Sequence, residues 1–413
     1  MLLLKNVYLN GKTQDVLIEN GTFSQIKSHI EQKNCETIDC KDKAILPTFC
    51  NTHTHASMMF LRGIGEDLEL FDWLENEIWP RENKLTPEMI YHLSRFAVLE
   101  MIKTGTTMFL DMYFYADETI KAACEMGVRA LVTYVGMDMF DENETQRRLE
   151  NAKSFLAQKS PSALVQKGLS CHAVYTASQK LICGFKELAN RKDAYFHIHT
   201  SETQKEVSDC LKKYGKRPIQ LIDDWGVLDE NTIIAHAVHL DDDEISRVAR
   251  AKAIVAHNPT SNLKLNSGQM PLQKYLDRGV RVALGTDSVS SNNSLSMISE
   301  MKVAALSAKS AANSSTAAKV SDIFKTATQN GFEALGVKAG KIQEGYLADF
   351  MLLDLKCHAL LPNVNLVSNM VYSADSSVIC DVFCNGKPLM QNRVVAGEDE
   401  IVQNFKAVCK SLC

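Results

Sequence analysis

The sequence predicts an α/β protein, a (β/α)8 TIM-type barrel with a small β-sandwich domain formed by both chain termini. Two observations carry this prediction. From residue 49 onward, short β-branched or apolar runs alternate with longer amphipathic stretches, which is the pattern of repeated βα units. The segments outside this region carry alternating residues and Asn-Gly turns, as β-hairpins do. We therefore expect a barrel over residues 49–345 and a β domain over residues 1–48 and 346–413.

Eight candidate strands can be counted in the barrel region. They are FCNTHTH (49–55), TTMFLDM (106–112), RALVTYVG (129–136), KGLSCHAVY (167–175), AYFHIHTSE (194–202), TIIAHAVHL (232–240), AIVAHN (253–258) and RVALGTDS (281–288). Helix-like segments such as KELANRKDA and DDDEISRVARAK separate most of them. Strands joined by helical crossovers run parallel, and eight of them close most economically into a barrel.

The two terminal segments are expected to pair with each other. Asn-Gly pairs at 10–11, 20–21 and 385–386 mark hairpin turns. Between and beside these turns, YLADFMLLDL and VSNMVYSADSSVICDVFCNGKPL are β-like in composition. We expect one β domain assembled from both ends of the chain.

Composition bounds the class of protein without naming a function. With 413 residues, of which 45% are hydrophobic and 23% charged, the chain is typical of a globular protein. A net charge of -5 argues against a nucleic-acid binder, and no apolar run reaches the ~18 residues that span a membrane. The N-terminus does not resemble a signal peptide, and twelve scattered cysteines without a CxxC pair favour free thiols. We expect a cytoplasmic protein.

Polar residues lie at the end of nearly every candidate strand. The carboxyl ends of barrel strands converge on one face, so residues far apart in sequence become neighbours there. The set is His53, His55, Asp111, His172, His199, Glu202, His236, His239, His257 and Asp287.

Four of these residues form the predicted metal site. His53 and His55 are two apart on one strand, so both imidazoles lie on the same face. With His199 and Asp287 they give three imidazoles and one carboxylate, a set that leaves a position for water and lowers the water pKa to about 7. His197 shares the strand face of His199; we prefer His199 because it is nearer the strand end, and assign His197 a packing or supporting role.

Several longer motifs resemble one known family. NTHTHASMMFLRGIGEDLELFDWL, HTSET, AHAVHL, AHNPTSNLKL, GTDSVSSNNSLSM and GKIQEGYLADFMLLDL resemble the amidohydrolase superfamily, specifically its 5'-methylthioadenosine/S-adenosylhomocysteine deaminases. The similarity covers essentially the whole chain. It implies hydrolytic deamination of the adenine ring of S-adenosylhomocysteine, 5'-methylthioadenosine or adenosine, giving the inosine analogue and ammonia.

The resemblance also implies roles for individual residues. His53, His55, His199 and Asp287 match the metal ligands. Glu202 matches the carboxylate that protonates the purine nitrogen, and His236 matches a histidine that stabilises the attacking water. In the implied mechanism Asp287 also takes the water's remaining proton.

Substrate contacts are implied in the same way. Glu82 matches a residue that holds the ribose hydroxyls, and Arg148 and His172 match further contacts. Tyr134 departs from the pattern, since a relative has Arg there near the substrate's amino-acid tail. The order of preference among the three nucleosides is therefore left open.

The remaining expectations concern cofactor, partners and alternatives. We expect one divalent metal, zinc by default, although this donor set also accepts Fe, Mn or Ni. The partner is a small-molecule nucleoside, with no nucleic acid and no membrane, and the chain can form a homo-oligomer. Another amidohydrolase activity, on guanine, cytosine or a triazine, or a catalytically silent binding or scaffold protein, are the alternatives. Whether Asp111, His239 and His257 support the site or cap strand ends stays open.

Overall fold

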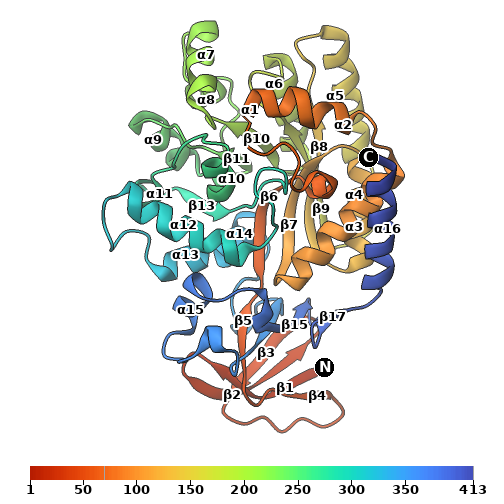
Figure 1. Ribbon diagram of the computed structural model, residues 1–413, viewed down its shortest axis with the longest axis vertical. Helices are drawn as coiled ribbons and strands as arrows, with labels where there is room; N and C mark the ends of the chain where they lie inside the picture. Colours follow the sequence, from red (N-terminus) through yellow and green to blue (C-terminus); the bar gives the residue numbers. More distant parts are fainter. Residues whose placement is uncertain (69, 413) are drawn as a thin grey trace.

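The computed structural model describes residues 1–68 and 70–412, and in it a parallel barrel stands above a separate β sheet (Figure 1). The predicted barrel is confirmed, because eight parallel strands pair in chain order. These strands are β6 (Phe49–Thr54), β7 (Thr106–Tyr113), β8 (Arg129–Gly136), β9 (Val165–Cys171), β10 (Phe196–Thr200), β11 (Thr232–His236), β12 (Ile254–His257) and β13 (Arg281–Leu284).

The first and last strands meet through a few specific contacts. The backbone N–H of Asp287 donates to the carbonyl of His53 (3.0 Å), and Thr52 Oγ1 donates to the carbonyl of Leu284 (2.9 Å). Gly285 lies where the two strands approach, because a Cβ there would stand 2.8 Å from the backbone N of His53. The residue after the last strand is thereby held beside the HxH pair of the first.

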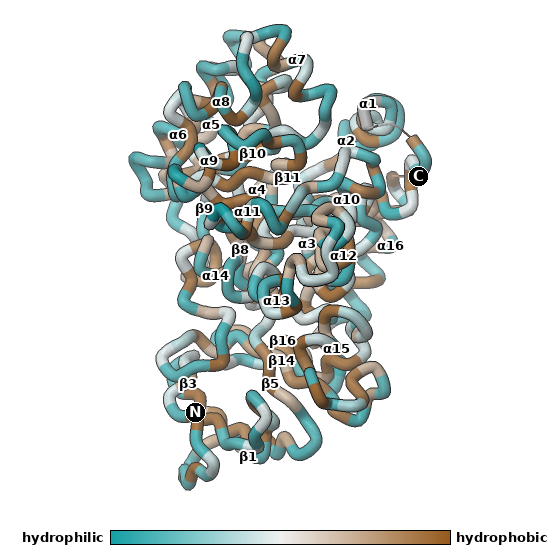
Figure 2. The backbone as a smooth tube through the Cα atoms, turned by 90° about the vertical axis from the view of Figure 1, so that its left-hand side faces the viewer, coloured by the Kyte–Doolittle hydropathy of each residue, from teal (hydrophilic) through white to brown (hydrophobic). Residues whose placement is uncertain are grey.

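Helices cover the outside of the barrel, and their inward faces are apolar. α9, for example, begins with a capping box between Asp241 and Glu244, and buries Ile245 and Val248. Figure 2 shows the resulting contrast between hydrophobic β10 and β11 and more hydrophilic outer helices. The helices of the barrel region are η1 (Ala56–Leu61), α1 (Leu70–Trp73), η2 (Leu74–Ile78), α2 (Trp79–Glu82), α3 (Pro87–Lys103), α4 (Ala116–Met126), α5 (Glu142–Ala157), α6 (Gln179–Asn190), α7 (Gln204–Tyr214), α8 (Pro218–Asp224), α9 (Asp242–Ala251), α10 (Pro259–Lys264), α11 (Leu272–Asp277), α12 (Met297–Ala311), α13 (Val320–Ala327) and α14 (Gln329–Ala334).

The β domain contains strands from both termini, as predicted. Its mixed sheet runs in the order β17-β16-β15-β14-β5-β1-β2-β3, and β4 pairs with β1. All three predicted Asn-Gly pairs form turns in which both residues have positive φ. The strands are β1 (Leu2–Leu9), β2 (Lys12–Glu19), β3 (Thr22–Lys27), β4 (Glu36–Asp39), β5 (Lys43–Pro47), β14 (Phe350–Asp354), β15 (Ile379–Cys384), β16 (Lys387–Gln391) and β17 (Val394–Val395).

Four segments differ from the expected strands. Those expected at 232–240 and 281–288 end earlier, at His236 and Leu284. The sequence VSNMVY lies in a helix, α15 (Leu366–Tyr372), because the side chain of Asn365 caps the N–H of Ser368 (3.0 Å) and the helix buries Met370 and Val371. The segment after Cys171 leaves the barrel in a turn, in which the Thr176 hydroxyl accepts a hydrogen bond from the N–H of Ala173 (3.2 Å).

The remaining helices are η3 (His358–Leu360), η4 (Ser376–Val378) and α16 (Glu398–Leu412). α16 packs against α3 at the side of the barrel (Figure 1), where Phe96 and Phe405 stack at 3.8 Å. The ten cysteines from Cys35 to Cys384 are free thiols. Among the described residues no helix is both long and apolar enough to cross a membrane.

Candidate active site and metal centre

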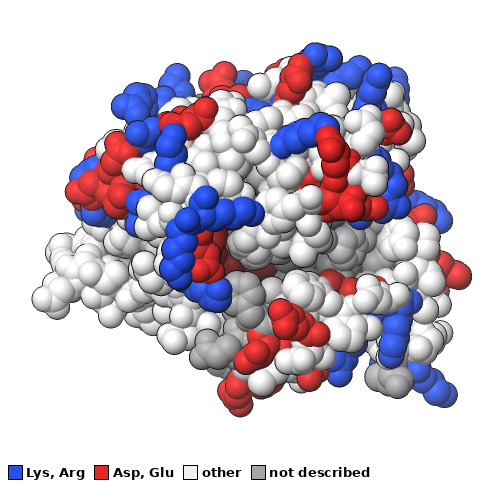
Figure 3. Space-filling view, turned by 90° about the horizontal axis from the view of Figure 1, so that it is seen from above, with Lys and Arg blue, Asp and Glu red and all other residues white. Residues whose placement is uncertain are grey.

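A pocket of about 760 Å³ opens at the carboxyl ends of the barrel strands. Figure 3 looks onto this end of the molecule and shows a hollow with acidic side chains inside it. Apolar side chains such as Met58, Trp73 and Leu265 line the pocket beside its polar groups. The polar groups that line it include His55, Glu82, Tyr113, His172, His199, Glu202, His236 and Asp287. We call it the inner pocket.

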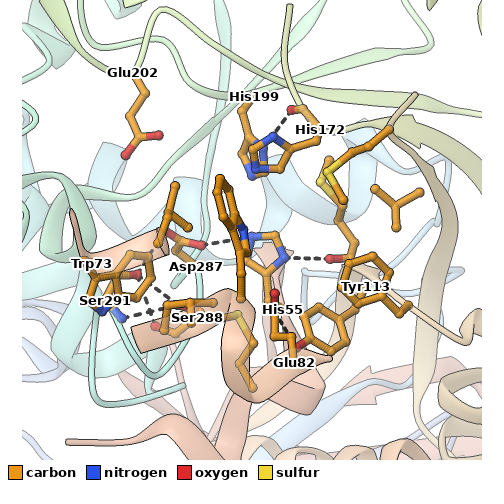
Figure 4. Close-up of a pocket in the computed structure, with 18 of the residues that line it drawn as sticks. His55, Trp73, Glu82, Tyr113, His172, His199, Glu202, Asp287, Ser288 and Ser291 are labelled. Atoms are coloured by element: carbon orange, nitrogen blue, oxygen red, sulfur yellow. Dashed lines mark hydrogen bonds and ion pairs between the residues drawn. The ribbon is translucent and has the colours of Figure 1, made fainter. Parts of the chain in front are cut away.

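At the inner pocket, the side-chain ends of three histidines and one aspartate, namely His53, His55, His199 and Asp287, come together. Figure 4 shows His55, His199 and Asp287 of this cluster. Asp287 Oδ1 lies 3.4 Å from Nε2 of His53 and 3.3 Å from Nε2 of His55. His53 Nε2 is also 3.2 Å from Nε2 of His199. Ligands bound tetrahedrally at the 2.0–2.1 Å typical of zinc are about 3.3–3.4 Å apart, so these separations fit one shared cation.

The other ring nitrogens explain why the Nε2 atoms are free to bind a cation. Nδ1 of His55 donates to the carbonyl of Met112 (2.6 Å), and Nδ1 of His199 donates to the carbonyl of His172 (2.8 Å). Since a carbonyl can only accept, each of these rings carries its proton on Nδ1 and has a lone pair on Nε2.

His53 reaches the same state through His197. His197 donates from Nδ1 to the carbonyl of Ile233 (3.0 Å), so its Nε2 accepts from His53 Nδ1 at 2.9 Å. Two lone pairs, on Nε2 of His53 and of His199, therefore face each other with no proton between them. That arrangement is repulsive unless a cation lies there, so the donor set fits a divalent metal.

Burial keeps two of the histidines in the neutral form that binds metal. Burial lowers the pKa of His53 to about 4 and that of His199 well below its usual value, so both rings are neutral. The hydroxyls of Ser261 (2.6 Å) and Ser291 (3.1 Å) donate to Asp287 Oδ2, leaving Oδ1 for the cation.

Glu202 and His236 form a second pair in the inner pocket. His236 Nε2 lies 3.7 Å from Glu202 Oε2, and the hydroxyl of Ser267 donates to Glu202 Oε1 (3.1 Å). The turn that carries Glu202 is fixed by Glu206, whose buried carboxylate accepts from the N–H groups of Ser201 and Glu202 at 2.9 and 2.8 Å. A carboxylate and an imidazole thus lie close to the histidine cluster, where a proton could be exchanged with a bound molecule.

A larger cavity of about 2100 Å³, the outer chamber, adjoins the inner pocket. The two share a wall that includes Glu82, which accepts a hydrogen bond from Tyr113 Oη (2.6 Å) and whose pKa burial raises. Tyr134 and Arg148 line only the outer chamber. The expected substrate contacts therefore divide, with Glu82 and His172 at the inner pocket and Arg148 farther out.

The residues whose roles were open have contacts of their own. Asp111 accepts from the N–H of Ala56 (2.7 Å) and so holds the turn that follows His55. His239 donates to the carbonyl of Ser267 (2.6 Å). His257 is buried, and its ring makes no hydrogen bond within residues 1–68 and 70–412.

Sequence reasoning missed several residues that touch the site. Tyr113 follows Asp111 at a strand end, so the same strand-end rule could have found it. Ser261 and Asn262 lie within the quoted motif AHNPTSNLKL, but nothing in their spacing indicates which groups they contact.

Comparison with known proteins gives consistent results. The amidohydrolase family model matches residues 44–389. A 5'-deoxyadenosine deaminase of Methanocaldococcus jannaschii is 40% identical, covering 97% of this chain and 96% of the relative. A 5-methylthioadenosine/S-adenosylhomocysteine deaminase of Thermococcus sibiricus is 41% identical, covering 94% of each.

Solved structures agree with this result. The structure of an adenosine deaminase from Xanthomonas campestris with bound zinc is 31% identical with a TM-score of 0.93, covering 100% of this chain and 98% of that one. An atrazine chlorohydrolase from Arthrobacter aurescens, 23% identical with a TM-score of 0.91 over 99% of this chain and 100% of that one, shares the fold. With a model match over most of its length and relatives of about 40% identity, this chain belongs to the amidohydrolase family.

Proposed function

We propose that this protein hydrolytically deaminates the adenine ring of a 5'-substituted or free adenine nucleoside, giving the inosine analogue and ammonia. The substrates considered are S-adenosylhomocysteine, 5'-methylthioadenosine, 5'-deoxyadenosine and adenosine. The single observation that carries the proposal is the cluster of Nε2 and carboxylate atoms at about 3.3 Å spacing, with Glu202 and His236 beside it. Relatives named as deaminases of these nucleosides support the choice of substrate.

We propose that His53, His55, His199 and Asp287 hold one divalent metal. Zinc is the ion bound in the adenosine deaminase relative, and three imidazoles with one carboxylate suit it, although Fe, Mn or Ni would also bind this set. When bound, such an ion activates a water molecule for attack on carbon.

The chain's own residues then move the protons. Glu202 gives a proton to N1 of the adenine as C6 is attacked, which neutralises the negative charge that would otherwise develop on the purine. Asp287 takes one proton from the water and passes it to the departing amino group. The second proton of the water returns to Glu202, so C6 gains oxygen, N1 keeps a proton and ammonia leaves. His236 donates from Nε2 to the attacking oxygen and stabilises its charge.

The two cavities fit the two ends of the proposed substrate. The inner pocket, with its apolar walls, accepts the purine, and Glu82 at the shared wall accepts hydrogen bonds from the ribose hydroxyls. The 5' substituent then extends toward the outer chamber and Arg148. The partner is accordingly a small-molecule nucleoside.

A substrate panel tests the proposal. Purified protein loaded with zinc is mixed with each of the four nucleosides, and with guanine and cytosine, while ammonia release is measured. We expect ammonia from the nucleosides only. Asp287→Ala should reduce the bound metal and abolish the release. Ammonia from guanine or cytosine but not from the nucleosides would refute the substrate class, and an active Asp287→Ala variant would remove Asp287 from the site.

A further inference from the structure

The short helix α10 and the turn after it, residues 258–267, contact three polar groups of the inner pocket. These groups are His236, Asp287 and Glu202. We infer that this segment is a positioning element, in which Asn262 fixes the ring nitrogen of His236 that carries the proton. The inference rests on the proposed deamination. It assigns a role to a side chain that is buried and does not line the inner pocket.

His236 differs from the neighbouring histidines in the partner of its Nδ1 atom. Nδ2 of Asn262 donates to His236 Nδ1 at 2.8 Å, and Nδ2 of Asn258 lies 3.4 Å from the same atom. Both amide nitrogens are donors, so His236 Nδ1 has to accept. The proton of a neutral His236 ring therefore lies on Nε2, whereas His53, His55 and His199 carry theirs on Nδ1.

This difference decides what His236 can do. Ring nitrogens of His236, His53 and His199 lie within 4.8 Å of one another, so all three residues could bind one ion on distance alone. A protonated Nε2 has no lone pair for a metal, and instead donates a hydrogen bond into the inner pocket. Asn262 thereby keeps His236 from being a ligand and makes it a donor toward the attacking oxygen.

The same segment also holds the other two groups. Ser261 Oγ donates to Asp287 Oδ2 (2.6 Å). The carbonyl of Asn262 accepts from the N–H of Ser267 (2.8 Å), and Ser267 Oγ donates to Glu202 Oε1 (3.1 Å). Asn262 and these two serines are each 5% exposed or less. Three buried polar side chains of one segment thus contact His236, Asp287 and Glu202.

Nitrogen NMR of histidine in the full-length protein measures the proton position directly. The protein is labelled with ¹⁵N-histidine and examined both without metal and with zinc, and the His236 signals are identified by their loss in His236→Asn. We expect Nδ1 of His236 to lack a proton and Nε2 to carry one. In Asn262→Asp the carboxylate can only accept, so Nδ1 should gain a proton. A protonated Nδ1 in the unsubstituted protein would overturn the inference, because an amide oxygen would then face it.

Kinetics test whether the placement matters for the reaction. We expect kcat of Asn262→Asp for 5'-methylthioadenosine to fall about 100-fold, because Nε2 of a neutral His236 no longer donates to the attacking oxygen, while KM changes less than about threefold. Asn151→Asp makes the same substitution at an exposed position of α5, outside this segment, and should leave kcat unchanged.

Two outcomes would contradict this role of Asn262. One is an unaltered kcat in Asn262→Asp. The other is a lower Tm and less bound zinc in Asn262→Asp while His236 Nδ1 still lacks a proton. That result would mean that the Asn262 side chain has only a structural role. If the unsubstituted protein releases no ammonia from any of the nucleosides, the proposed function fails, whereas the NMR spectrum still decides where the His236 proton lies.

Discussion

The inner pocket and the outer chamber adjoin each other, yet they hold their charged groups in opposite ways. In the inner pocket, Asp287 and Glu202 are both buried, and each has a fixed partner that is buried as well. In the outer chamber, Glu144 lies 2.7 Å from Arg147 and 3.5 Å from Arg148, and all three side chains are partly exposed. The charged side chains are therefore held in place in the inner pocket, whereas those of the outer chamber can adjust their positions.

This difference predicts which substitutions should change activity and which should change substrate preference. A buried charged group that loses its partner is costly, whereas an exposed ion pair contributes little. The inner pocket should therefore govern whether the reaction occurs, and the outer chamber only which 5' substituent is preferred. Substitutions in the two cavities, taken from the largest expected effect to the smallest, test this division.

Glu202→Gln should have the largest effect. Gln keeps the shape and can still accept from Ser267, but it has no proton to give to N1, so we expect kcat to fall about 1000-fold. Bound zinc and Tm should stay within error of the unsubstituted protein. The matched control is Glu230→Gln at an exposed site. Normal turnover in Glu202→Gln would show that another group donates the proton.

His197→Leu should weaken metal binding although it replaces none of the proposed ligands. Leu cannot accept the proton of His53 Nδ1, so that ring is no longer held with its lone pair toward the cation. Loss of such a supporting partner costs about 10–100-fold in metal affinity, which competition with a chelator measures. His197→Gln, which keeps an acceptor, should lose less. Equal affinities for Leu, Gln and His would mean that His197 only fills space.

The same division explains how much the sequence could predict. The barrel and the histidine cluster follow from strand periodicity, because parallel strands bring their carboxyl ends to one face, and the HxH spacing fixes two side chains on it. The contacts of Asn262 and Ser261 could not be predicted, because the direction of a short helix is fixed only by its packing. VSNMVY was misjudged because its β-branched valines favour a strand, while the cap from Asn365 and tertiary burial favour a helix.

The outer chamber was the least predictable part. Glu144 lies on α5, whose sequence is that of an ordinary exposed helix, and only packing shows that it faces a cavity. Tyr134 was identified by a departure from the family pattern, and its ring lies against Phe155, with centroids 5.9 Å apart, at the chamber wall.

Glu82→Gln tests the wall that the two cavities share. Glu82 accepts from Tyr113, and its charge is expected to hold the ribose; hydrogen bonds to a charged group are worth about 1.5–3 kcal/mol. We expect KM for adenosine to rise about 10-fold, with a smaller change in kcat. If the ribose hydroxyls are the partners, the substitution should matter much less for deoxyadenosines that lack the 2' or the 3' hydroxyl. An equal rise in KM for adenosine and both deoxyadenosines would contradict that contact.

Glu144→Gln should have the smallest effect, and one confined to the 5' substituent. It removes the acid beside Arg148, so the guanidinium becomes freer to bind the carboxylate of an amino-acid tail. We expect kcat/KM for S-adenosylhomocysteine to rise about threefold, a modest change because the released pair is exposed, and the value for 5'-methylthioadenosine to stay constant. Glu142→Gln changes an acid in the same helix turn that pairs instead with Lys180, outside the outer chamber, and controls for helix stability. If Glu144→Gln shifts both substrates equally, the outer chamber does not discriminate between tails by charge.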